Sequence, residues 1–173
     1  AGLLITGVNL VGGLAVGTEY FRSNLAGGST NFRAVFIGSH HLWYRVESGV
    51  QFFPFAERYV DLQLKGHRLV ANSLEYYGPG PDSDKRARSN YLREENAVDL
   101  SVAFKPTRRG FRFGFATGHL WFDIDHGKSR IYGSSKTEFP PDLAPGIDRP
   151  ARYLRFGPFL EVDSRDKPGD PHR

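Results

Sequence analysis

The stretch AVDLSVAF at residues 97–104 decides the fold class. Every second residue in it is large and apolar: Val98, Leu100, Val102 and Phe104. The residues between them are small or polar: Asp99, Ser101 and Ala103. Side chains of a β-strand point alternately to its two faces, so this period of two predicts a strand with one apolar face and one polar face.

The same alternation recurs on both sides of this stretch. Residues 57–66 place Val60, Leu62 and Leu64 on one face and Asp61, Gln63 and Lys65 on the other. Residues 42–52 and 153–163 repeat the pattern. A helix would need apolar residues three and four apart, and we find no window of useful length with that spacing. The chain is predicted to be all-β.

We expect about eight strands in an antiparallel up-and-down meander, at residues 2–10, 13–23, 29–39, 42–53, 57–77, 91–104, 110–125 and 153–163. Several exceed the roughly five or six residues usual in soluble sheets and match the roughly 9–11 residues of a tilted membrane-crossing strand. The first strand alternates poorly. The strand at 57–77 would project well beyond a membrane or bend at Gly66.

The connections alternate in length. SNLAGG, PFAE and KPTRRG (residues 23–28, 54–57 and 105–110) are predicted to be tight turns. Residues 77–90 and 126–150 make much longer connections. Short turns at one end and long loops at the other are typical of outer-membrane barrels, whose short turns are periplasmic. On this interpretation the N-terminus is periplasmic.

Composition excludes several classes of protein. The 173 residues contain 23 Lys plus Arg, 19 Asp plus Glu and no Cys, with a net charge of +4. The absence of Cys excludes disulfide scaffolds, zinc–thiolate sites and Cys nucleophiles. No apolar run approaches the roughly 18 residues of a membrane-spanning helix. The positive charge is small and dispersed, so nucleic acid is not an expected partner. The chain contains no Met and is interpreted as a piece of a longer protein.

A soluble β-sandwich or lipocalin-like barrel would also show alternation with long loops. The residues of the polar face distinguish the possibilities. They combine small side chains with both charge signs: Gly17, Gly49, Ala103, Gly157, Arg45, Glu47, Asp61, Lys65, Arg155 and Glu161. This mixture favours the lining of an aqueous lumen. Aromatic residues near the predicted strand ends are typical of the interfacial girdles of membrane barrels.

Four segments resemble a known family. YYGPGPDSDKRARSNY (76–91), APGID (144–148) and LEVDSRDKPGDPHR (160–173) are similar, in order and spacing, to motifs of the BamA/TamA-like bacterial surface-antigen barrels. GLAVGTEYFRSNLAGGS (13–29) is similar to that family's second strand and the turn after it. The family-motif residues, expected to have structural roles, are Gly78, Gly80, Asp82, Ser83, Asp163, Arg165, Asp166 and Pro171.

The resemblance implies the N-terminal half of a sixteen-stranded transmembrane barrel in the bacterial outer membrane, with no POTRA domain in the chain. It implies a role in inserting or translocating outer-membrane proteins, with outer-membrane lipids, unfolded clients and assembly partners as expected partners. In such proteins a client strand pairs with the open edge at the barrel seam. Only the first strand of that seam, around Leu3 to Leu10, would be present here. Gly2, Gly7, Gly12 and Gly13 suit a weakly paired edge.

Two other functions stay open at this stage. One is a self-contained eight-stranded outer-membrane anchor or small pore, although its Gly- and Ala-rich lumen face would underfill so narrow a barrel. The other is a soluble barrel that binds an apolar ligand. In the D-x-R-D segment, Arg165 is expected to bridge carboxylates of neighbouring strands while Asp166 caps the following turn.

Candidate chemistry is sparse. Asp123, Asp125 and His126 end a predicted strand, where acidic residues are more often solvated than metal-bound. His40 and His41 lack a third ligand at useful spacing. The sequence contains no G-x-S-x-G, and GPGPDS lacks the Lys and the helix of a phosphate-binding loop. We therefore expect no enzymatic activity, no metal and no cofactor.

Overall fold

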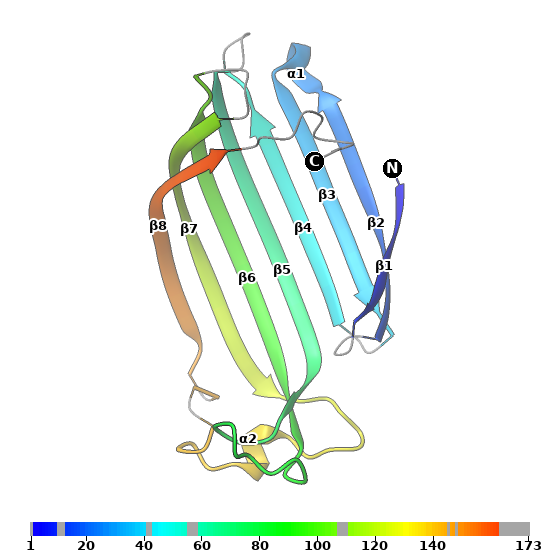
Figure 1. Ribbon diagram of the computed structural model, residues 1–173. Coiled ribbons are helices and arrows are strands. Elements are labelled where there is room, and N and C mark those ends of the chain that lie inside the picture. Colours follow the sequence, from blue (N-terminus) through cyan, green and yellow to red (C-terminus); the bar gives the residue numbers. More distant parts are fainter. Residues whose placement is uncertain are drawn as a thin grey trace.

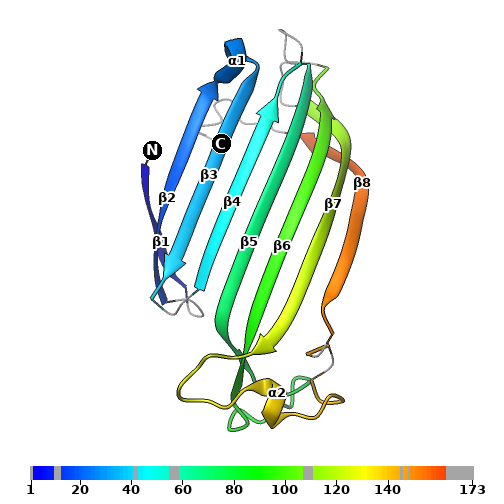
Figure 2. The same ribbon diagram turned by 180° about the vertical axis from the view of Figure 1, so that it is seen from behind.

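The architecture is taken from a computed structural model of the chain. It describes backbone and side chains for residues 14–40, 43–54, 59–106, 111–144, 146–147 and 149–162, and the backbone alone for residues 2–9 and 13. Figures 1 and 2 show one antiparallel sheet, in which each strand lies beside its neighbours in the sequence.

The sheet contains eight strands in the order β1-β2-β3-β4-β5-β6-β7-β8. Their bounds are β1 Gly2–Asn9, β2 Gly13–Asn24, β3 Thr30–Ser39, β4 Trp43–Phe52, β5 Val60–Tyr76, β6 Ser89–Phe104, β7 Phe111–His126 and β8 Ala151–Val162. The all-β fold and the up-and-down order are confirmed, and each predicted strand end lies within about three residues of the observed one. The alternation predicted these strands because it persists through each of them.

The β2–β3 turn lies at the opposite end of the sheet from the two long connections, as predicted, whereas the short step from β3 to β4 lies at the long-loop end (Figure 1). The turn between β2 and β3 contains α1, Leu25–Gly28, in which Ala26 and Gly27 have positive φ, so this segment is a tight turn rather than a regular helix. The connection between β7 and β8 contains α2, Ser135–Glu138. Sequence periodicity missed α2 because one helical turn is too short to show a repeat of 3.6 residues.

Strands β5, β6 and β7 extend past their neighbours at the end of the long loops (Figure 1). They have 17, 16 and 16 residues, whereas β3 and β4 have ten each. The register of β5 on β6 shifts between Ala71 and Leu74, which separates the paired main stretch of these strands from a projecting tip. Of the two outcomes expected for the long strand at 57–77, a projection or a bend at Gly66, these strands show the projection past their neighbours.

The sheet is open. Among the described residues, β1 pairs with β2 alone and β8 with β7 alone, so two strand edges remain free. One layer of sheet, rather than two stacked sheets, makes up the described strands. A closed transmembrane barrel, which the sequence analysis expected this half to help form, is not seen. No helix among the described residues has the length and apolar character needed to cross a membrane.

Candidate functional site

The two faces of the sheet are the main functional feature, because register and alternation sort the side chains between them. Leu64 of β5 pairs with Leu100 of β6, which pairs with Thr117 of β7, which pairs with Phe156 of β8. Directly paired residues point to the same face. We call one face of the sheet the outer face. It contains the even-numbered residues along most of β2 to β6 and β8, together with the odd-numbered residues of β7.

The outer face is apolar and exposed. Leu100 is 51% exposed and Phe156 is 72% exposed. Other exposed members of this face are Leu14, Val16, Phe36, Val46, Val50, Phe52, Leu64, Val98, Phe104, Phe113, Phe115, Leu154, Leu160 and Val162. They extend across β2 to β8 without another layer over them. An apolar surface of this extent is far larger than a soluble monomer usually leaves open to water.

The opposite, inner face has small residues and ion pairs. All ten residues that the sequence analysis assigned to the polar face share it. Arg33 pairs with Glu19 at 2.5 Å, Arg45 pairs with Glu47, and His67 Nε2 lies 2.9 Å from Glu95 Oε1. The inner face is the less exposed one: Ala103 is 1% exposed, although its neighbour Phe104 is 45% exposed.

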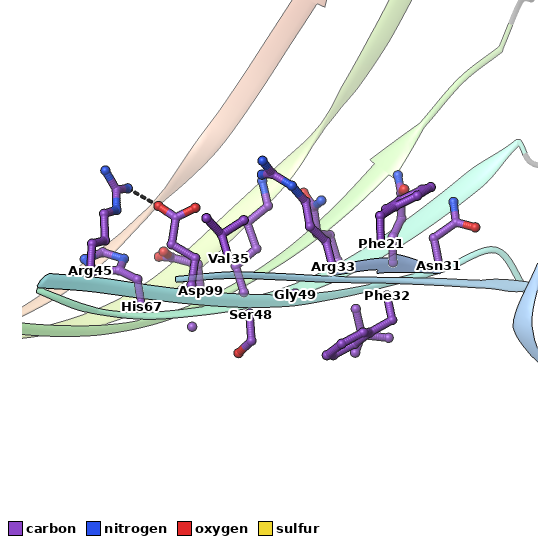
Figure 3. A pocket seen from close by; sticks show the side chains of 16 residues that line it. Phe21, Asn31, Phe32, Arg33, Val35, Arg45, Ser48, Gly49, His67 and Asp99 are labelled. Carbon is purple, nitrogen blue, oxygen red and sulfur yellow. Dashed lines mark ion pairs between the residues drawn. The ribbon is translucent and has the colours of Figure 1, made fainter. Parts of the chain in front are cut away.

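Figure 3 shows the separation of the two faces at close range. Arg33, Arg45, His67 and Asp99 rise from one side of the ribbon, whereas Phe32 leaves from the other. The more distant strands rise on the same side as the charged residues, so the polar face is the concave one. An open hollow of about 370 Å³ lies there, over Gly49 and Gly66.

One ion pair on the inner face spans two strand spacings. Arg155 of β8 donates to both carboxylate oxygens of Asp99 on β6, at 2.9 and 2.7 Å. Gly118 of β7 lies between them in register. A Cβ at Gly118 would lie 1.9 Å from Asp99 Oδ1, so the pair can form only because residue 118 has no side chain. Arg155 thus ties β8 to β6 across β7.

A second cluster lies toward the tight-turn end of the inner face. Asp61 is 1% exposed and accepts a hydrogen bond from Gln51 Nε2 at 2.7 Å. Lys105 Nζ lies 3.1 Å from the same carboxylate oxygen, and Arg112 lies 4.0 Å from it. A buried carboxylate requires such partners because burial of an unpaired charge costs several kcal/mol. The cluster joins β4, β5 and β7 at this end.

The family-motif residues of the first long loop lie in an ordered cap. Gly78 and Gly80 have φ of 99° and 88°, a conformation that favours glycine. A Cβ at Gly78 would lie 3.5 Å from the ring of Phe139, and that ring packs edge-on against Tyr76 at a centroid distance of 5.1 Å. The long loops between β5 and β6 and between β7 and β8 therefore pack together. Asp82 is exposed in the turn, and Ser83 is half-buried.

Asn90 holds the cap to β6. Its side chain is 0% exposed and donates to the carbonyl oxygens of Tyr132 and Gly133 at 2.7 and 2.8 Å. Its Oδ1 accepts from Ser129 N at 3.1 Å. Sequence reasoning missed Asn90, because a lone Asn before a strand resembles any turn residue. The other family-motif residues, Asp163, Arg165, Asp166 and Pro171, lie outside the described residues.

The residues weighed for metal chemistry have ordinary partners. Asp125 accepts from the backbone N–H of His126 at 2.7 Å and from Lys136 at 3.3 Å. His126 Nδ1 lies 3.2 Å from Ser134 Oγ, and His40 Nδ1 lies 3.4 Å from Leu14 O. Within the part of the chain that the structure describes, no three His, Asp or Glu side chains form a metal-binding group. His41 lies outside it.

Comparison with protein-family models, with curated proteins and with solved structures gave no match to this chain.

Proposed function

We propose that this chain forms part of the wall of a transmembrane β-barrel in a bacterial outer membrane, with the outer face against lipid and the inner face toward an aqueous lumen. The single observation that carries this proposal is the arrangement of the two faces: exposed apolar residues on the convex side and ion pairs on the concave side. A soluble barrel that binds an apolar ligand would have the opposite arrangement, with apolar residues on the concave side.

The free energy of apolar exposure supports lipid as the solvent of the outer face. Burying one Val, Leu or Phe side chain is worth roughly 1.5–3 kcal/mol. More than a dozen such side chains are exposed on this face, so water is a poor solvent for it. In a bilayer the same residues contact acyl chains, and the strands satisfy each other's backbone groups except at the open edges.

The height of the apolar zone fits a bilayer. On β8 it extends from Leu154 to Val162, which at about 3.4 Å per residue is about 27 Å along the strand. A strand tilt of about 35–45° gives this described part of the zone a height of about 19–22 Å, close to the ~25 Å apolar band of outer-membrane barrels. On β6 the zone runs from Val98 to Phe104, and beyond Val98 the outer-face residues are Asn96 and Glu94.

The proposed activity is assistance in the insertion or translocation of outer-membrane proteins, as the family resemblance implies. The open β1 edge supports it. The pairing of β1 with β2 is irregular between Thr6 and Asn9. A free, weakly paired edge offers unpaired N–H and C=O groups to a client strand. A self-contained eight-stranded barrel would instead pair β1 with β8, and among the described residues no such pairing joins these strands.

A client-folding assay tests this activity. The protein is reconstituted into vesicles, and the folding rate of an unfolded outer-membrane barrel protein into them is compared with its rate into empty vesicles. We expect faster folding with the protein present. Deletion of residues 1–12 removes β1 and should abolish the acceleration while the protein still enters vesicles. Equal client folding rates in empty and protein-containing vesicles, or full acceleration after the deletion, would contradict the proposed activity.

A further inference from the structure

One row of outer-face residues marks where the apolar zone ends toward the long loops. The register aligns them across five strands: Val46 of β4, Arg68 of β5, Asn96 of β6, Trp121 of β7 and Arg152 of β8. We call Arg68, Asn96, Trp121 and Arg152 the boundary row. Toward the tight turns, the next row is Ser48, Gly66, Val98, His119 and Leu154. Toward the long loops, Glu94 and Asp123 follow.

The inner face changes character at the same height. Beside the boundary row it gains large apolar side chains from three strands, β4, β5 and β7: Trp43, Leu69, Leu120, Phe122 and Ile124. These residues are half-buried, and Arg93 of β6 lies over the ring of Phe122 at 5.0 Å. On the long-loop side of the boundary row, the outer face carries the charged Glu94 and Asp123, and its apolar residue Val70 is buried. Exposed apolar side chains therefore end at this row on the outer face, while the inner face becomes apolar, as in a sheet that meets water. The reversal places the lipid–water interface at this row.

The guanidinium groups in the boundary row are presented outward. Arg68 is fixed in place: its Nε donates to Tyr44 Oη at 3.2 Å, and a terminal nitrogen donates to Asn96 Oδ1 at 3.2 Å. Arg68 also forms an ion pair with Glu94 at 3.4 Å, and its side chain is still 46% exposed. Arg152 is exposed, and no carboxylate of the described residues pairs with it. Arg152 is therefore the freer cation.

Trp121 lies in register between the two arginines, with its ring 4.0 Å from that of His119. Tryptophan prefers the headgroup level of a bilayer, where its ring contacts lipid and its N–H contacts water. Arg68 and Arg152 are three strand spacings apart, or about 14 Å at about 4.8 Å per strand. The carboxylates of Glu94 and Asp123 lie nearer the long loops, so a phosphate approaching from the lipid side meets the guanidiniums first.

We propose that the boundary row binds the phosphate groups of anionic lipid headgroups in the leaflet on the long-loop side. This inference rests on the proposed membrane location of the sheet. A guanidinium matches the geometry of a phosphate with two parallel N–H donors. Arg152 supplies the main charge, Arg68 is the pre-oriented second contact, and Trp121 anchors the glycerol region between them. The ligand is a lipid rather than free phosphate, because exposed apolar surface continues from the row toward the tight turns.

Lipid selectivity in vesicles tests the proposal. The protein is reconstituted into phosphatidylcholine vesicles with a minor fraction of phosphatidylglycerol, and the lipids retained by the protein are counted by native mass spectrometry. Near a membrane surface each cationic residue contributes about 1 kcal/mol, or about fivefold. We therefore expect Arg152→Gln to lower the preference for phosphatidylglycerol about fivefold. Arg152→Lys should retain most of the preference, and Arg68→Gln should lower it further in combination.

Lys65→Gln is the matched control. It removes one positive charge from the same sheet at an exposed inner-face position, and the preference should not change. The proposal would be overturned if Lys65→Gln lowered the preference as much as Arg152→Gln, or if the Arg68→Gln/Arg152→Gln variant kept the full preference. Displacement of phosphatidylglycerol by inorganic phosphate at about 10 mM would also overturn it. Failure of the wild-type protein to enter vesicles would instead refute the membrane location, so the two failures are distinguishable.

Discussion

Replacing Gly118 with Ala tests the packing of the inner face most sharply. The new Cβ would lie 1.9 Å from Asp99 Oδ1 and 2.9 Å from the carbonyl oxygen of Val98, so both the carboxylate and the backbone must move. The half-exposed Arg155–Asp99 pair is worth about 0.5–1 kcal/mol, and overpacking costs about 1–3 kcal/mol. A gain of about 0.5 kcal/mol from restricting the unfolded chain offsets part of this. We expect the free energy of unfolding to fall by about 2 kcal/mol.

The assay is reversible denaturant unfolding in micelles or vesicles, followed through the fluorescence of the two tryptophans. Gly157→Ala is the matched control, because it lies on the same face of the next strand and its Cβ would meet nothing within 4 Å. It should leave the free energy of unfolding unchanged or raise it slightly. In an Asp99→Ala background, Gly118→Ala should cost at least ~1 kcal/mol less, because the carboxylate clash is gone. Equal costs for Gly118→Ala and Gly157→Ala would refute the packing argument.

Three further outcomes are expected. Leu100→Arg should lower the free energy of unfolding from a bilayer by about 2–4 kcal/mol, whereas Ser101→Arg, on the inner face, should cost clearly less. Unfolding from vesicles measures both costs, and equal costs would refute the assignment of the two faces. Asn90→Ala should speed trypsin cleavage at Lys128 and Arg130 severalfold without reducing membrane insertion, because three hydrogen bonds hold that loop; unchanged cleavage would contradict this. Glu75 lies in the projecting tip of β5. It accepts a hydrogen bond from Tyr77 and pairs with Arg88, so its pKa lies below its ordinary value. The stabilisation is present above the ordinary pKa of Glu75 and is lost as pH falls through the lowered one. The protection of cap amides against hydrogen exchange, corrected for the intrinsic rate at each pH, should therefore fall with acid in the wild type and fall less in Glu75→Gln; an equal fall in both would contradict this.

The sequence predicted the strands and their faces because period-two alternation is a local signal. Leu100 and Asp99 point to opposite faces whatever the register, so no knowledge of partners was needed to separate them. The same reasoning could not identify the Arg155–Asp99 pair, whose members are 56 positions apart and meet only over Gly118. Contacts that span two strands depend on the register of both pairings, which alternation does not specify.

The boundary row was missed for a related reason. Arg68, Asn96, Trp121 and Arg152 each occur at the point where the alternation on one strand weakens. They form a row only once the register places them side by side. The cap was missed because its packing, such as Tyr76 against Phe139, joins two loops without periodic sequence. The Gly78 and Gly80 motif did locate one of those loops.

Side-chain environment at two adjacent residues of β6 tests the lipid-facing assignment most directly. The chain has no native Cys, so Leu100→Cys and Ser101→Cys each give one nitroxide attachment site. In vesicles, collisions with oxygen report lipid contact, and collisions with a water-soluble nickel chelate report aqueous contact. Collisions with oxygen should dominate at residue 100, and collisions with the nickel chelate should dominate at residue 101. Equal accessibility at both sites, or the reverse order, would contradict it.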